Sequence, residues 1–225
     1  MEISGFKATG AGAWDYEGWP DGTPVKDRKI LAGIYIGEDV TGCNIHDNVL
    51  EGNRDGIYLG EGSSGNTFER NNASENYEGF ELTQSGIEGS HYNTFRGNIA
   101  NYNFEYGFRM NSSSYNTFID NTANHNGLES GEGRGFWAVG GSGNDNNTFT
   151  GNTANGNDRA GFQLNMGTGT TFTGNTADGN LGEAVDGDYE WAGIIIDSGE
   201  DLADFTMTGN TITGHEIGIL IWTVG

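Results

Sequence analysis

The sequence predicts an all-β fold in which short parallel strands wind into a solenoid of about seven to eight coils. Two observations carry this prediction: a glycine followed by apolar-x-apolar recurs every 23 to 32 residues, and asparagine returns at fixed places between the copies. Because one short strand cannot bury its apolar side alone, the copies must stack. The glycines that open the copies are Gly33, Gly56, Gly79, Gly107, Gly135, Gly161, Gly193 and Gly218.

Apolar columns run through the aligned copies and define the inward side of each strand. In one copy Phe108 and Met110 are two residues apart, which puts them on the same face of a strand. Phe118 and Ala123 belong to two further columns, which continue as Phe149 and Ala154 in the next copy. Stacked in register, these columns form one continuous core.

Asparagine fills two columns at the predicted corners. Its side chain tolerates the left-handed backbone of a tight corner, and its amide can bond the coils above and below. We therefore expect two structural ladders. The first is Asn48, Asn71, Asn98, Asn121, Asn152, Asn175 and Asn210, and the second is Asn53, Asn76, Asn103, Asn126, Asn157 and Asn180, with His215 in the last coil.

The whole chain, residues 1–225, is expected to form one domain. Residues 7–29 interrupt the pattern and are predicted to form an irregular loop, whose Trp14, Tyr16 and Trp19 cover the open end of the core or stack on sugar rings. The ends of a solenoid normally need caps. We therefore expect the chain to be part of a longer protein with neighbouring coils or domains.

The composition excludes several partners. Ten Lys and Arg residues stand against 32 Asp and Glu residues, which gives a formal net charge of −22. Such a surface repels nucleic acid and anionic lipid, and the sequence has no apolar run long enough to span a bilayer. The first residues lack the pattern of a signal peptide, and a single cysteine leaves the redox compartment undecided.

Two long insertions leave the same corner two coils apart and predict the walls of a groove. They are residues 127–134 and 181–192, with a short connection between them. The outward position of the intervening strands holds Arg109, Trp137 and Gln163, an aromatic platform with polar neighbours that suits a sugar ring. Aromatic residues also favour sheet surfaces for structural reasons. The candidate binding residues are Tyr106, Arg109, Trp137, Arg159, Gln163, Tyr189 and Trp191.

The unit Asn53-Arg-Asp-Gly-Ile-Tyr-Leu59, followed by Asn66-Thr-Phe68, resembles the PbH1-type repeat of right-handed parallel β-helix proteins, namely the NosD-like proteins and the carbohydrate-binding and sugar-hydrolase domains. The resemblance covers nearly the whole chain from Ile30 and implies a right-handed, single-stranded parallel β-helix. Within it, residues 106–127 resemble the catalytic coil of mannuronan C5-epimerases, and residues 157–162 resemble one of their later coils.

The departures from the epimerase motif matter more than the match. That motif reads Tyr-Gly-Phe-Asp-Pro-His, and of its reactive side chains only the tyrosine is present, as Tyr106. Arg109 stands at the aspartate position, Asn111 at the histidine position, and Val139 near the second aspartate. Epimerisation needs a base, an acid and charge neutralisation, so the resemblance does not carry that activity to this chain.

Other enzyme classes remain alternatives. A polysaccharide lyase would use an arginine as base or carboxylate neutraliser with Tyr106 as acid, and the candidate catalytic residues are Tyr106, Arg109, Arg134 and Arg159. A glycoside hydrolase needs two carboxylates about 5 to 9.5 Å apart. The acidic candidates are Glu129, Glu132, Asp186, Asp188 and Glu190.

No motif in the sequence assigns a cofactor, and calcium is the candidate metal. Calcium could use the oxygen-rich loop of Asp186 and Asp188, or residues 144–146. Cys43 and His46 are three residues apart on a strand and point to opposite faces, which argues against copper. Outward Thr-x-Thr pairs on successive coils, such as Thr171 and Thr173, leave an ice-binding solenoid as a further alternative.

Binding is favoured over catalysis because the aligned coils supply no complete catalytic set. The sequence predicts a polysaccharide-recognition module acting outside the cytoplasm, secreted, periplasmic or at the cell surface. A carbohydrate-active lyase, epimerase-like enzyme or hydrolase is the alternative, and a structural spacer is the third class.

Overall fold

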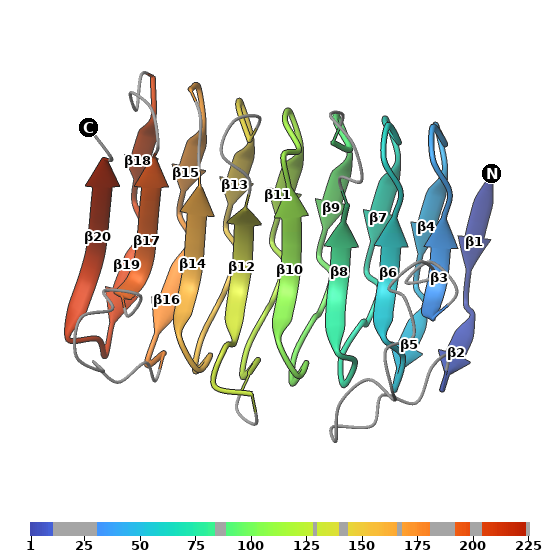
Figure 1. The fold of residues 1–225 in the computed structure, drawn as a ribbon, viewed down its shortest axis with the longest axis horizontal. Helices are drawn as coiled ribbons and strands as arrows, with labels where there is room; N and C mark the ends of the chain where they lie inside the picture. The colour runs from blue at the N-terminus through green and yellow to red at the C-terminus, as the bar shows by residue number, and fades with distance from the viewer. Residues whose placement is uncertain are drawn as a thin grey trace, which may run out of the picture.

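The computed structural model is a row of stacked coils that runs from the N-terminus at one end to the C-terminus at the other (Figure 1). It describes residues 1–10, 31–83, 89–127, 130–139, 144–165, 168–180, 192–198 and 204–223. Within these ranges the regular elements are all β-strands, and every strand pairing is parallel. The predicted all-β parallel β-helix is confirmed.

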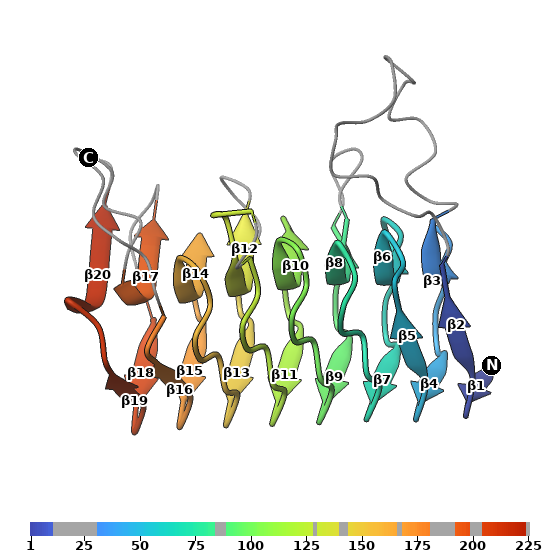
Figure 2. The ribbon, with the colours of Figure 1, turned by 90° about the horizontal axis from the view of Figure 1, so that it is seen from below.

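Two eight-stranded sheets form the main walls of the solenoid, and Figure 2 shows them on opposite sides of the coils. The short-strand sheet comprises β1 (Glu2–Ser4), β4 (Asn44–His46), β7 (Thr67–Glu69), β9 (Thr94–Arg96), β11 (Thr117–Ile119), β13 (Thr148–Thr150), β15 (Thr171–Thr173) and β18 (Thr206–Thr208). The long-strand sheet comprises β3 (Ala32–Ile36), β6 (Asp55–Leu59), β8 (Glu78–Leu82), β10 (Tyr106–Asn111), β12 (Arg134–Val139), β14 (Ala160–Asn165), β17 (Ala192–Ser198) and β20 (Ile217–Thr223).

A third wall completes each coil. At one end β2 (Lys7–Thr9) pairs with β5 (Val49–Glu51), and at the other β16 (Thr176–Asp178) pairs with β19 (Thr211–Thr213). Single bridges continue this wall between the two pairs. The prediction that residues 7–29 form an irregular loop was wrong for residues 7–9, because Ala8 takes the inward position beside Leu50 as in any later coil. Residues 11–30 lie outside the described part.

The core is built from the predicted apolar columns. Phe80, Phe108, Phe136 and Phe162 stack along the long-strand sheet with ring centroids 4.5 to 4.8 Å apart. A second phenylalanine stack faces them from the short-strand sheet and meets them edge to face, as Phe118 meets Phe136. Edge-to-face and offset packing are favourable arrangements of aromatic rings. The same columns of apolar side chains therefore build the core and fix the register of the strands.

The repeated glycine is explained by a close approach inside each coil. A Cβ added at Gly107 would lie 2.7 Å from the Cβ of Ala123 and 2.7 Å from the carbonyl oxygen of Gly135. The same alanine column meets the glycines of the neighbouring coils, as Ala154 meets Gly135. Only glycine leaves room at this bend between the walls.

Both predicted asparagine ladders are present. Asn121 is buried, and its Oδ1 accepts hydrogen bonds from the backbone N and the Nδ2 of Asn98, both at 2.9 to 3.0 Å. Its own Nδ2 donates to the carbonyl oxygen of Phe95 and to Oδ1 of Asn152. His215 ends the second ladder next to Asn180, as expected. The amides thus satisfy backbone groups that the corners would otherwise leave buried without partners.

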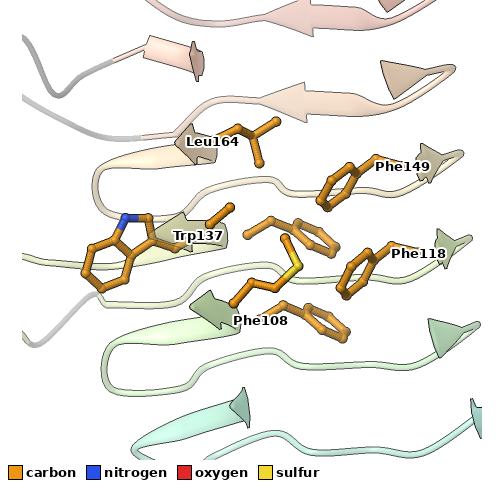
Figure 3. Close-up of a pocket in the computed structure, with 8 residues that line it drawn as sticks. Phe108, Phe118, Trp137, Phe149 and Leu164 are labelled. Atoms are coloured by element: carbon orange, nitrogen blue, oxygen red, sulfur yellow. The ribbon is translucent and has the colours of Figure 1, made fainter. Parts of the chain in front are cut away.

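One gap interrupts the core beside β12. Ala138 stands where neighbouring coils have Met110 and Leu164, and a cavity of about 10 Å³ remains between these side chains and the phenylalanines. Figure 3 shows Phe108, Phe118, Phe149 and Leu164 on the core side, while the indole of Trp137 lies on the opposite side of its strand. The cavity belongs to the core and not to the outward face.

Candidate functional site on the outward face of the long-strand sheet

Polar and aromatic side chains form two rows on the outer face of the long-strand sheet. Strand pairing aligns Glu81 with Arg109, Arg109 with Trp137, and Trp137 with Gln163. The second row, one residue before each glycine, aligns Glu78 with Tyr106 and with the following coils. Its members are Asp55, Glu78, Tyr106, Arg134 and Ala160.

The centre of this face is a cluster of two aromatic rings and two guanidinium groups. The ring centroids of Tyr106 and Trp137 are 4.5 Å apart. The guanidinium carbon of Arg109 lies 5.2 Å from the Trp137 ring centroid, and that of Arg134 lies 4.8 Å from it. Both distances are within the range of cation–π attraction. Trp137 itself is only half-buried.

The cluster continues toward β14 through polar contacts. Nε of Arg134 donates to Oε1 of Gln163, and its Nη1 donates to the carbonyl oxygen of Glu132 at 2.9 Å. The Glu132 carboxylate also accepts from Nη2 of Arg159 at 2.6 Å. The sequence predicts one site for Tyr106, Arg109, Trp137, Arg159 and Gln163, and these contacts bring all five together with Arg134.

On the other side the cluster joins a buried network of charges that was not predicted from the sequence. Nη1 of Arg109 lies 3.2 Å from Oε1 of Glu78 and 3.4 Å from Oε1 of Glu81. Arg54 reaches Oε1 of Glu78 at 3.3 Å and also pairs with Asp55. A signal was present in the sequence, because acidic residues precede the glycine in two successive copies, at Asp55 and Glu78.

The electrostatics of the site keep its cations charged. Burial alone would lower the pKa of Arg109, but the carboxylates of Glu78 and Glu81 outweigh burial and raise that pKa above its usual value. The pKa of Arg54 is raised in the same way by Glu78 and Asp55. Burial raises the pKa of the Tyr106 hydroxyl. None of these three groups changes its protonation near neutral pH.

The three carboxylates of Asp55, Glu78 and Glu81 each offer an oxygen within 4.8 Å of the others, a spacing at which they could share a metal ion. Two guanidinium groups already occupy the space between them, since Arg54 bridges Asp55 and Glu78, and Arg109 bridges Glu78 and Glu81. The arrangement is therefore a buried ion-pair network.

The other metal candidates from the sequence lie elsewhere in the chain. Asp186 and Asp188 lie outside the described residues. In the other candidate, residues 144–146, the Asn144 side chain is buried and engaged, because its Oδ1 accepts from the backbone N of Ser113 and its Nδ2 donates to two carbonyl oxygens. Cys43 faces the core and His46 the surface, as predicted, so they do not form a site together.

Several predicted site residues cannot be placed. Tyr189, Trp191 and Glu190 lie outside the described part of the chain, as does Glu129. The predicted wall 181–192 is described only at Ala192, and the wall 127–134 only at residue 127 and at 130–134. The groove between these walls therefore stays a prediction. Among the described residues there is no helix able to cross a membrane.

Two solved structures are similar to this chain. Pectate lyase Pel9A is similar in structure with a TM-score of 0.43 and 22% identity, over 81% of this chain and 53% of the lyase, so the chain spans about half the length of that protein. The A-module of the mannuronan C-5 epimerase AlgE6 of Azotobacter vinelandii gives a TM-score of 0.37 and 18% identity, over 87% of this chain and 75% of the epimerase.

A search of curated proteins gives no significant match to the chain. The family described as "Right handed beta helix region" matches residues 28–149 and 87–225, which together span the coils from β3 to the end of the chain. The match also indicates that the coils wind in the right-handed sense, which strand pairing alone does not show. The chain therefore belongs to the right-handed β-helix family.

Proposed function

We propose that this protein recognises a polysaccharide on the outward face of the long-strand sheet, over Trp137 and its neighbours. The half-buried Trp137 ring, whose centroid lies 5.2 Å from the guanidinium carbon of Arg109 and 4.8 Å from that of Arg134, carries the proposal. Sugar rings pack their C–H faces against such a ring, and their hydroxyl groups take hydrogen bonds from charged and amide side chains. Gln163 lies one coil further on and supplies an amide.

Rigidity supports recognition at this place. Trp137, Arg109 and Gln163 sit in register on three adjacent strands, with phenylalanines locked behind them in the core. A site on strands keeps its geometry better than a site on loops. Little side-chain entropy is then lost when a glycan binds, which favours affinity.

The raised pKa of Arg109 and its ion pairs favour binding over proton transfer at this site. A lyase base must give up its proton, whereas Arg109 is paired with two carboxylates and its pKa is raised. Hydrolases hold their two carboxyl groups about 5 to 9.5 Å apart. The carboxylates of Asp55, Glu78 and Glu81 are instead bridged by the guanidinium groups of Arg54 and Arg109.

We place this activity outside the cytoplasm, where structural polysaccharides accumulate. The strongly acidic surface, with a net charge of −22, agrees with a protein that stays soluble in a salty exterior.

Retention on insoluble polysaccharides tests the proposal. The wild-type protein and Trp137→Ala are passed over a panel of immobilised glycans, with Tyr92→Ala as the control. Tyr92 is also a large aromatic residue, 61% exposed, and it lies just before β9 of the short-strand sheet. We expect the wild type and Tyr92→Ala to be retained on at least one glycan and Trp137→Ala to pass through. Equal retention of all three proteins removes the site.

A further inference from the structure

We infer that the last three coils carry a second binding face, which recognises the surface of ice. The face covers β13, β15 and β18 of the short-strand sheet and the part of the third wall that follows them. Figure 2 shows these strands on the opposite side of the coils from the long-strand sheet, which carries Trp137. The two sites share no residue, so this inference is independent of the proposed function.

One sequence motif builds the face three times. Thr-x-Thr-Gly-Asn-Thr occupies residues 148–153, 171–176 and 206–211. Strand pairing and single bridges hold the three copies in register, so that each threonine lies beside the equivalent threonine of the next coil. We call these nine residues the threonine face. They are Thr148, Thr150, Thr153, Thr171, Thr173, Thr176, Thr206, Thr208 and Thr211.

The preference of threonine for strands does not explain this pattern. Valine, isoleucine and the aromatic residues favour strands as well. None of them takes an outward position in β13, β15 or β18, where all six outward residues are threonine. Earlier strands of the same sheet vary at the second outward position, which holds His46, Glu69, Arg96 and Ile119. The identity of the repeats therefore points to a surface whose regularity matters.

The backbone behind the face is held rigidly. Phe149 and Phe172 alternate with the threonines, point into the core and are at most 1% exposed. Nδ2 of Asn152 donates to Oδ1 of Asn175 at 3.0 Å, which ties the corners of two neighbouring coils together. The corner between the two walls is glycine in every copy, so no side chain rises above the face there. These glycines are Gly151, Gly174 and Gly209.

The threonines form a lattice with two repeats. Neighbouring coils are about 4.8 Å apart, and alternate residues of one strand are about 6.7 Å apart. Each lattice point offers one methyl group and one hydroxyl group, which both donates and accepts hydrogen bonds. Oγ1 of Thr173 lies 3.2 Å from Oγ1 of Thr208, and in β13, β15 and β18 no other outward threonine side chain is hydrogen-bonded to a described residue. Most of the hydroxyl groups are therefore left to water.

A lattice of this kind selects a ligand that is itself a lattice. One hydroxyl group contributes little, so useful affinity arises only when many contacts form at once at matching spacings. The surface of ice repeats in two directions, and each of its water molecules donates and accepts hydrogen bonds. A dissolved molecule cannot engage all nine threonines in this way.

The charge of the face agrees with a neutral ligand. The chain carries a net charge of −22, yet no charged side chain takes an outward position in β13, β15 or β18. On the third wall the face ends at Asp178, whose carboxylate accepts a hydrogen bond from Thr213. A crystalline polysaccharide is also a neutral lattice, but sugar rings pack on aromatic faces, and these three strands present none outward.

Inhibition of ice recrystallisation tests the inference. The wild-type protein, Thr173→Lys and Thr94→Lys are compared over a series of protein concentrations, and far-UV circular dichroism checks that each is folded. Thr173→Lys places a long cation at the centre of the threonine face. Thr94→Lys makes the same change on the same sheet but outside the face, at a half-buried threonine whose strand also carries Arg96.

We expect the wild type to arrest recrystallisation. Thr173→Lys should need at least about tenfold more protein for the same effect, because a disrupted lattice loses simultaneous contacts. Thr94→Lys should stay within about twofold of the wild type, as is usual for a surface substitution. If Thr173→Lys does not fold, Thr150→Lys makes the equivalent change one coil earlier.

The other outcomes contradict the inference. It is overturned if the wild type has no effect on ice, or if the wild type and both folded variants inhibit equally. Retention on crystalline cellulose or chitin that Thr173→Lys abolishes, without any effect on ice, would assign the face to a crystalline glycan instead. Trp137→Ala should inhibit recrystallisation as the wild type does, and its failure to do so would contradict two independent sites.

Discussion

The guanidinium group of Arg109 makes two contacts: its carbon is 5.2 Å from the centre of the Trp137 ring, and its Nη1 is 3.2 Å from Oε1 of Glu78. The first contact faces the proposed sugar site, and the second neutralises a buried carboxylate. The same side chain therefore links recognition on the surface to stability beneath it. This double role leads to the first prediction.

Replacing Arg109 by methionine should destabilise the fold by about 3 kcal/mol, because removing one partner of a buried ion pair leaves uncompensated charge. The double variant Arg109→Met with Glu81→Gln should recover part of this loss, since it removes one of the two acids that Arg109 neutralises. Urea unfolding of the single and double variants measures both effects. A loss below about 0.5 kcal/mol in the single variant would show that the network is already solvated.

The asparagine ladder predicts a second, purely structural effect. Asn121→Ala leaves the backbone N–H of Asn98 without its acceptor Oδ1 and removes the hydrogen bond to the carbonyl oxygen of Phe95. Each buried group left without a partner costs about 1 to 3 kcal/mol, so we expect a total loss of at least about 2 kcal/mol. Asn124→Ala is the matched control, since Asn124 is half-buried and its Oδ1 accepts one hydrogen bond, from the backbone N of Asn155. Chemical denaturation that ranks the two variants equally would contradict the ladder's role.

The cavity beside β12 predicts a stabilising change. Ala138→Val adds methyl groups where about 10 Å³ is empty, and should raise the free energy of unfolding by about 1 kcal/mol. Ala154→Val adds the same groups where the Cβ already crowds Gly135, and should destabilise by about 1 to 3 kcal/mol. The two variants should therefore shift the thermal midpoint in opposite directions. A fall in the midpoint of Ala138→Val would mean that the gap cannot accept a branched side chain.

His46 predicts a pH effect on the short-strand sheet. Hydrogen bonds to Asp47 and then to Glu2 raise the pKa of His46 above 6.5. A raised pKa means that the protonated ring stabilises the folded state at acidic pH, and that this contribution is lost as pH rises through the folded-state pKa. The NMR titration midpoint of His46 should lie above 6.5 and should fall in Asp47→Asn. An unchanged midpoint in that variant would assign the shift to another group.

The fold could be predicted because every coil repeats the same physical problem. Phe108 and Phe136 face the core for the same reason, and the asparagine columns supply the corner bonds each time. The prediction of an irregular loop was wrong at residues 7–9, because a single copy that lacks the repeated glycine resembles a loop. Alternation of Lys7, Ala8 and Thr9 was too short to be distinguished from an irregular segment.

The site could be predicted only in part. Arg109, Trp137 and Gln163 follow from strand alternation, which fixes their common face. Asp55 and Glu78 could not be placed in the same way, because the bend at the repeated glycine breaks the alternation and turns the preceding residue outward. The pairing of Arg54 and Arg109 with shared carboxylates depends on side-chain reach between coils, which spacing alone does not give.

The most direct measurement follows the indole N–H signal of Trp137 by NMR while an oligosaccharide from the retained polysaccharide is added stepwise. The chain has five tryptophans, and the signal that disappears in Trp137→Phe identifies the one at the site. We expect this signal to shift progressively and to saturate with the ligand. Saturable binding that leaves the Trp137 signal in place would contradict recognition on this face.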